Sequence, residues 1–95
     1  MAFKPSKETI EYYHGKLRDI SSTGISFYTQ EPTMEPGREL ELKLRLPWKD
    51  KDFHIKGKVV WKRQVRDRFC VGVKFNTVDE EMKREIADHN ANMWK

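Results

Sequence analysis

Leucine alternates with charged residues from Glu39 to Leu46, and this pattern limits the fold more than any other feature of the chain. Leucines fill every second position from 40 to 46, and the positions between them hold Glu41, Lys43 and Arg45. Successive side chains of a β-strand point to opposite faces, so strict period two predicts a strand with one buried and one solvated face. We expect the leucines to lie in a core and the charged residues to face solvent.

Other segments of the chain also read as strands. The core face of residues 53–62 would hold Phe53, Ile55, Val59 and Trp61, and that of residues 69–75 would hold Phe69, Val71, Val73 and Phe75. Residues 10–20 and 25–28 form two earlier strands. Turns of hairpin length separate these segments, and Pro36-Gly37 is typical of a type II turn. Short strands joined by short turns favour an antiparallel barrel or sandwich.

The hydrophobic period changes to that of a helix after residue 76. Thr77 and Glu80 fit a capping box in which Thr77 is the N-cap. Helical spacing predicts an apolar stripe that faces the barrel, formed by Val78, Met82, Ile86 and Met93. Residues 1–9 are polar and contain Pro5, so we expect a flexible arm there. Residues 1–95 then form one domain, with an arm (1–9), a barrel (10–76) and a helix (77–94).

Composition favours a cytoplasmic protein without membrane insertion. No apolar run approaches the roughly 20 residues of a membrane helix. Cys70 is the one cysteine, which favours a reducing compartment. The net charge of +4 comes from 19 Lys and Arg against 15 Asp and Glu. Both signs are interspersed, so the charge fits a solvated surface better than a dedicated polyanion site.

No catalytic or metal-binding pattern is present in the sequence. His14, His54 and His89 lie too far apart for the usual spacing of metal ligands. The chain also lacks a nucleophile elbow and a glycine loop that would cradle phosphates. We therefore expect that the protein is not an enzyme and needs no metal or cofactor.

The most informative short motif is Asp-x-Ser-x-x-Gly at Asp19, Ser21 and Gly24. Taken alone, it reads as a turn in which Asp and Ser bond to the backbone. We expect Gly24 to supply a positive φ angle in this turn.

Together with its surroundings, this motif resembles the signature of a PilZ domain, the bacterial receptor module for cyclic di-GMP. The resemblance runs from about His14 to the C-terminal helix and includes, in order, Pro36-Gly37, Leu46-Pro47, the Gly57–Trp61 segment and the Val71–Phe75 segment. It implies an all-β fold, a six-stranded antiparallel β-barrel with a C-terminal α-helix. It also implies a nucleotide site at Asp19, Ser21 and Gly24, with Arg18 as a local cation.

One part of the family pattern is missing. PilZ domains that bind the messenger carry Arg-x-x-x-Arg upstream of this turn, whereas the chain has no arginine before Arg18. Lysines 4 and 7 have the wrong spacing, and a lysine cannot fork onto a guanine edge. Each bidentate arginine–guanine contact contributes about 1–3 kcal/mol, so losing two weakens binding roughly thirty-fold to twenty-thousand-fold. We expect this chain alone to bind cyclic di-GMP weakly or not at all, unless arginines come from outside it.

Two alternatives remain open. The first is a degenerate PilZ domain that binds another protein through Trp48, the exposed face of Trp61 to Arg68, or the helix, since Trp and Arg often anchor interfaces. The weaker one is a small barrel that binds single-stranded nucleic acid through basic and aromatic residues. We expect a protein partner and disfavour nucleic acid.

Overall fold

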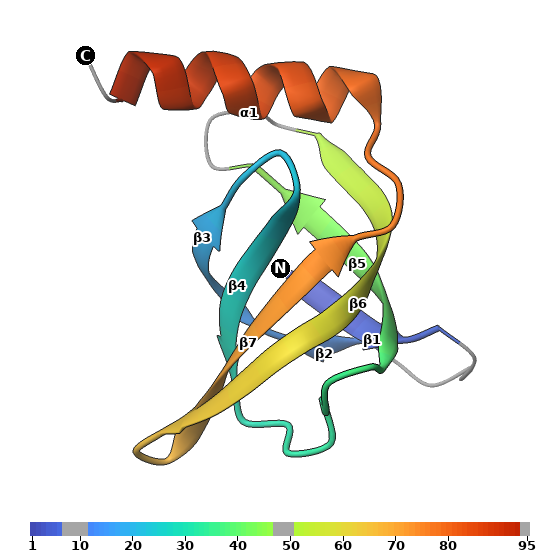
Figure 1. Cartoon of the computed structure of the whole chain (residues 1–95), viewed down its shortest axis with the longest axis vertical. Coiled ribbons are helices and arrows are strands. Elements are labelled where there is room, and N and C mark those ends of the chain that lie inside the picture. The colour runs from blue at the N-terminus through green and yellow to red at the C-terminus, as the bar shows by residue number, and fades with distance from the viewer. Residues whose placement is uncertain (7–11, 47–50, 94–95) are drawn as a thin grey trace.

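The computed structural model describes residues 1–6, 12–46 and 51–93, and the side chains of these residues up to Asp88. Seven strands precede one helix (Figure 1). The elements are β1 (Ala2–Pro5), β2 (Tyr13–His14), β3 (Lys16–Ile20), β4 (Gly24–Thr29), β5 (Glu39–Arg45), β6 (Asp52–Val65), β7 (Arg68–Phe75) and α1 (Glu80–Met93).

The strands form one curled antiparallel sheet in the order β2-β1-β5-β6-β7-β4-β3. The two outermost strands, β2 and β3, are separated in the chain by Gly15 alone. One stretch of chain therefore borders both ends of the sheet and curls it into a barrel-like shape (Figure 1). Counted together, β2 and β3 make a sixth strand. The predicted fold class, an all-β PilZ-like barrel followed by a C-terminal helix, is confirmed.

The alternating segments have the predicted register. The leucines of β5 and the following Leu46 are at most 1% exposed, and Val71, Val73 and Phe75 of β7 are also buried. Lys43 and Arg45 are exposed on the other face of β5. The type II turn is present as well, because Gly37 has φ of 94° and the Arg38 N–H donates to the Glu35 carbonyl at 3.1 Å.

The first residues of the chain are not a flexible arm, and the prediction is wrong for residues 2–5. They form β1, which pairs with β5 on one side and β2 on the other. Phe3 is fully buried, and its ring centroid lies 4.7 Å from that of Phe27. This strand could not be predicted from the sequence, because a single aromatic residue followed by Lys4 and Pro5 shows no hydrophobic periodicity. The rest of the expected arm, residues 7–9, lies outside the described residues.

Helix α1 begins later than predicted, at Glu80 rather than Thr77. Its N-cap is Asp79, whose Oδ1 accepts a hydrogen bond from the Glu81 N–H at 2.8 Å. Met82 and Ile86 are fully buried in the core, so the helix closes one end of the barrel. The predicted contact of Met93 lies outside the described side chains. In the part of the chain that the structure describes, no helix has the length and hydropathy to cross a membrane.

Candidate functional site

Two β-bulges lie on the same cross-strand row of the sheet. In β3 the register moves from Leu17 opposite Phe27 to Asp19 opposite Ser26, so Arg18 is an extra residue. In β6 it moves from Val59 opposite Val73 to Trp61 opposite Gly72, so Val60 is extra. The row across β3, β4, β7 and β6 is therefore Asp19, Ser26, Gly72 and Trp61.

The bulge at Val60 turns Trp61 to the outside of the barrel. We expected Trp61 in the core with Val59, and this prediction is wrong. A bulge puts two residues opposite one and breaks the alternation of faces, so the side chains beyond it change side. Val60 is 50% exposed and Trp61 is 37% exposed, whereas Val59 is buried.

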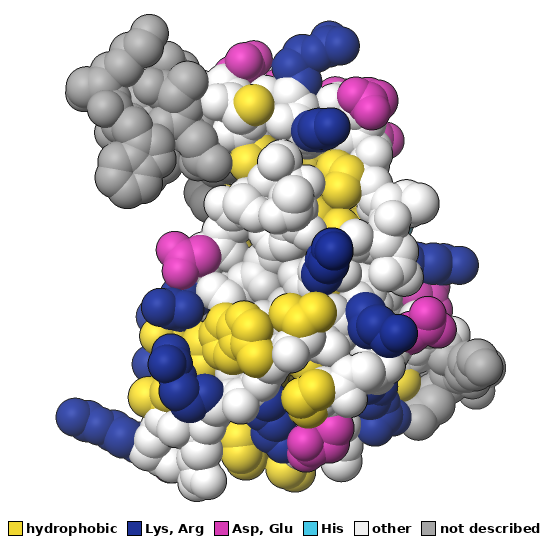
Figure 2. Space-filling view, in the orientation of Figure 1, with side chains coloured by type: hydrophobic (Ala, Val, Ile, Leu, Met, Phe, Trp, Pro, Cys, Tyr) yellow, Lys and Arg dark blue, Asp and Glu magenta, His cyan; other side chains and the backbone are white. Residues whose placement is uncertain are grey.

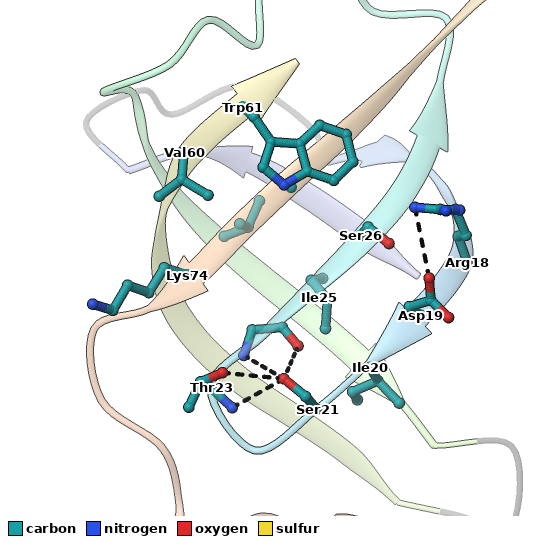
Figure 3. A pocket seen from close by; sticks show the side chains of 13 residues that line it. Arg18, Asp19, Ile20, Ser21, Thr23, Ile25, Ser26, Val60, Trp61 and Lys74 are labelled. Carbon is teal, nitrogen blue, oxygen red and sulfur yellow. Dashed lines mark hydrogen bonds and ion pairs between the residues drawn. The ribbon is translucent and has the colours of Figure 1, made fainter. Parts of the chain in front are cut away.

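A cleft of about 380 Å³ lies over the middle of this row. The middle of the row leaves space for the cleft because Ser26 has a small side chain and Gly72 has none. The Trp61 indole lies against the Gly72 backbone, since a Cβ on Gly72 would be only 2.1 Å from the indole Nε1. Figure 3 shows Trp61 on one side of the cleft, Arg18 and Asp19 on the other, and Ser26 between them.

The Ser26 hydroxyl is an unsatisfied polar group in the lining of this cleft. Ser26 is 6% exposed, and its Oγ has no hydrogen-bond partner among the described residues. A buried hydroxyl without a partner costs about 1–3 kcal/mol. The oxygen is almost wholly covered, so a ligand or water could bond to it and recover that free energy only after the groups that cover it had moved.

Ser21 is committed to its own turn. Its Oγ accepts hydrogen bonds from the backbone N–H groups of Thr23 (3.3 Å) and Gly24 (3.2 Å). The hydroxyl also lies 3.3 Å from the Gly24 carbonyl and 3.2 Å from the Thr23 hydroxyl (Figure 3). Ser21 therefore shapes the edge of the cleft by fixing the turn between β3 and β4.

Gly24 does not have the positive φ angle that we expected, and that prediction is wrong. Among the described glycines, Gly37 is the one with positive φ, and Gly24 is the first residue of β4. A glycine is needed at position 24 for a different reason. A Cβ there would lie 2.3 Å from the backbone oxygen of Val73 in the neighbouring strand.

The charged groups around the cleft are mostly cations. Arg18 Nη1 lies 3.6 Å from Asp19 Oδ2, and both side chains are well exposed, so this pair contributes less than about 1 kcal/mol. Lys74 also lines the cleft, and Lys58 is its partner in β6. The guanidinium carbon of Arg63 lies 5.7 Å from the centre of the Trp61 ring. In Figure 2, exposed hydrophobic side chains lie among Lys and Arg on this face.

The structure brings all four sequence-predicted site residues, Arg18, Asp19, Ser21 and Gly24, to this one cleft. The sequence analysis did not assign the other lining residues to the site, and these include Ser26, Val60, Trp61, Gly72 and Lys74. One signal was available for two of them. Val60 and Trp61 are consecutive apolar residues that follow Val59, and such a run in an alternating strand is compatible with a bulge.

No metal centre is visible in residues 1–6, 12–46 and 51–93, where no three His, Cys, Asp or Glu side chains cluster as ligands. His14 and His54 lie on different strands, β2 and β6. The cleft offers hydrogen bonds, cations and an aromatic surface, and this chemistry suits the binding of a planar or phosphorylated ligand.

Comparison with protein families agrees with the geometry. The family model of the PilZ domain matches residues 3–91, nearly the whole chain, and the match includes β1 from Phe3 onward. The chain belongs to the PilZ family. This is a family of regulatory and binding domains related to cyclic di-GMP, and it is not a class of enzymes. Comparisons with curated proteins and with solved structures gave no match.

Proposed function

We propose that this chain is a regulatory PilZ module of bacterial cyclic di-GMP signalling whose nucleotide site is incomplete. The observation that supports the proposal most directly is that Arg18, Asp19, Ser21 and Gly24 line one cleft together with Trp61. The Asp-x-Ser-x-x-Gly turn therefore lines a cleft, as the turn of a nucleotide receptor would. Without an arginine before Arg18, no side chain of this sequence can fork onto a guanine edge from the upstream arm.

The groups that remain in the cleft support the proposal that this chain alone binds cyclic di-GMP weakly or not at all. The Ser21 hydroxyl is already used by its turn, and the Asp19 carboxylate has Arg18 as its partner. An unpaired carboxylate would repel phosphates, and its exposed ion pair offsets that by less than about 1 kcal/mol. Lys74 offers an ammonium group in the lining, whereas the Ser26 oxygen is covered.

Calorimetric titration with cyclic di-GMP tests the proposal. The unmodified chain should show no heat of binding at low micromolar ligand. A grafted Arg-x-x-x-Arg arm should then create binding. The graft belongs ahead of Met1, because residues 2–5 are a strand of the sheet. Met1 bonds to Gly15, four residues before Asp19. An arm of eight residues spans about 26 Å when extended, twice the roughly 13 Å along β3 from Gly15 to Asp19.

The matched control is the same graft carrying Asp19→Ala, which should lose most of the gained affinity. Tight binding by the unmodified chain would contradict the proposal, because other cations would then replace the arm. A grafted chain that still does not bind would favour the second candidate function.

That second candidate is a degenerate PilZ domain that acts as a protein-interaction module. The observation that favours it is the exposure of Val60 and Trp61 beside Arg63, since Trp and Arg are common anchors of interfaces. Trp48, another candidate anchor, lies outside the described residues. Binding of single-stranded nucleic acid is the weaker alternative, and filter binding of oligonucleotides at low and high salt would detect it.

We further propose the bacterial cytoplasm as the compartment of this module. Cys70 is a buried free thiol, and a reducing compartment suits such a residue.

A further inference from the structure

A second cleft, of about 410 Å³, lies beside the first on the outer face of the sheet. It is lined by His14, Gly15, Lys16, Tyr28, Thr29, Gln30 and Arg68. Tyr28 lies two residues from Ser26 along β4, which corresponds to about 7 Å. None of the four residues predicted for the nucleotide site lines this cleft, so it is a separate feature of the molecule.

The lining of this second cleft is positively charged. The lining contains Lys16 from β3 and Arg68 from β7, and His14 of β2 adds an imidazole. Among the described residues, no Asp or Glu lines the cleft and no ion pair of Lys16 or Arg68 with a carboxylate is found. The chain elsewhere mixes both signs of charge, so a concave surface with cations alone is a local exception that favours an anion.

Arg68 is held in a geometry that suits an anionic ligand. Its guanidinium carbon lies 3.9 Å from the centre of the Tyr28 ring, the shortest cation–aromatic distance found in the described residues. Stacking uses the face of the guanidinium and leaves its N–H donors free in the plane. These donors match two oxygens of a phosphate group, and the stacked side chain loses little entropy on binding.

Lys16 provides a second cation on the other side of Tyr28. The two residues are direct partners in the β3–β4 pairing, so their side chains lie on the same face of the sheet. Arg68 lies two residues from Cys70, the direct partner of Tyr28 in β7, so it is diagonal to Tyr28 on the same face. Gln30, which follows the end of β4, adds an amide to the lining.

We propose that this cleft binds the phosphate group of a small phosphomonoester, with Arg68 as a bidentate donor and Lys16 as the second cation. The volume of about 410 Å³ lies within the range of about 300–1,000 Å³ that is usual for small-molecule sites, so it suits a small phosphorylated molecule. The site acts independently of the cleft at Asp19.

The test is a titration of the ¹⁵N-labelled chain with sodium phosphate, followed by NMR and referenced to sodium chloride at equal ionic strength and pH. Saturable shifts should appear at the amides of residues 14–16, 28–30 and 68. Adenosine 5′-monophosphate is the second probe. Tighter binding of the nucleotide would assign a contribution to its nucleoside, and equal binding would assign the affinity to phosphate alone.

Variants separate this site from general charge effects. Combining Lys16→Gln with Arg68→Gln should weaken phosphate binding by about tenfold or more, since hydrogen bonds to charged groups are the strong ones. Arg68→Lys keeps the charge but removes the fork, so it should also weaken binding. Lys43→Gln removes an exposed cation from β5, and Asp19→Ala alters the first cleft; both should leave the affinity within about a factor of two.

Three outcomes would overturn the proposal. The first is chemical-shift changes with phosphate that do not exceed those with sodium chloride. The second is an equal loss of phosphate affinity in Lys43→Gln and in the double variant. The third is an Arg68→Lys variant that binds phosphate with full affinity. Loss of phosphate binding in Asp19→Ala would also contradict the independence of the two clefts. Cyclic di-GMP binding by the grafted chain is a separate measurement, so either proposal can fail while the other stands.

Discussion

The same added methyl group should destabilise the fold to different extents at two glycines of the first cleft. A Cβ at Gly24 would lie 2.3 Å from the Val73 backbone oxygen, and a Cβ at Gly72 would lie 2.1 Å from the Trp61 Nε1. The overlaps are similar, but the neighbours differ. The Val73 oxygen belongs to a paired strand in the middle of the sheet, whereas the Trp61 indole is 37% exposed and can rotate into solvent.

Gly24→Ala should therefore destabilise the fold, and Gly72→Ala should mainly move the indole. Relieving the clash at Gly24 needs β4 and β7 to separate by about 1 Å, and such overpacking costs about 1–3 kcal/mol. At about 4–8 °C per kcal/mol for a domain of this size, the melting temperature should fall by roughly 4–24 °C. Gly72→Ala should cost less than about 1 kcal/mol, because the indole leaves a contact that is already partly solvated.

Urea denaturation followed by circular dichroism measures both changes, and tryptophan fluorescence reports the position of Trp61. The fluorescence experiment needs Trp48→Phe and Trp94→Phe in the background, because the chain has three tryptophans. Gly72→Ala should shift the Trp61 emission to longer wavelength with little change in the denaturation midpoint. Equal destabilisation by the two substitutions would refute the argument that the mobility of the neighbour decides the cost.

Two further predictions concern the helix. Met82→Ala should lower the free energy of unfolding by about 2–5 kcal/mol, because Met82 is fully buried on the inner side of α1. Lys83→Ala, on the exposed side of the helix, should change the melting temperature little. Asp79→Ala should cost about 0.5–2 kcal/mol through the lost N-cap, and Thr77→Ala should stay within about 0.5 kcal/mol, both read from urea midpoints. A larger effect at Thr77 than at Asp79 would mean that the capping box predicted from the sequence is the correct one.

Strands with regular alternation could be predicted from the sequence, and the positions where alternation breaks could not. The leucines of β5 are buried as expected because no bulge interrupts that strand. Trp61 was assigned to the wrong face because one extra residue, Val60, shifts the pleat. Strand β1 was missed because its stability comes from pairing with β5, a partner distant in the chain, and from the burial of Phe3.

The same distinction holds for the first cleft. Asp19, Ser21 and Gly24 were found because they lie within six residues of one another and form a local motif. Ser26 and Gly72 were not found, since a serine and a glycine inside strands carry no local signal. Their role depends on register, because the pairing of β3, β4, β7 and β6 places them between Asp19 and Trp61.

The two bulges add residues to the cleft lining without changing the register of the cross-strand row. Each bulge is a single inserted residue, Arg18 in β3 or Val60 in β6, so one lost codon would remove it. Without Val60, Trp61 would follow Val59 directly, and regular alternation would still place it opposite Gly72 on the outer face. What would be lost is the exposed Val60 side chain and the local bend of the bulge. A deletion at either position would therefore keep the register of the row and remove one residue of the cleft lining, Arg18 or Val60.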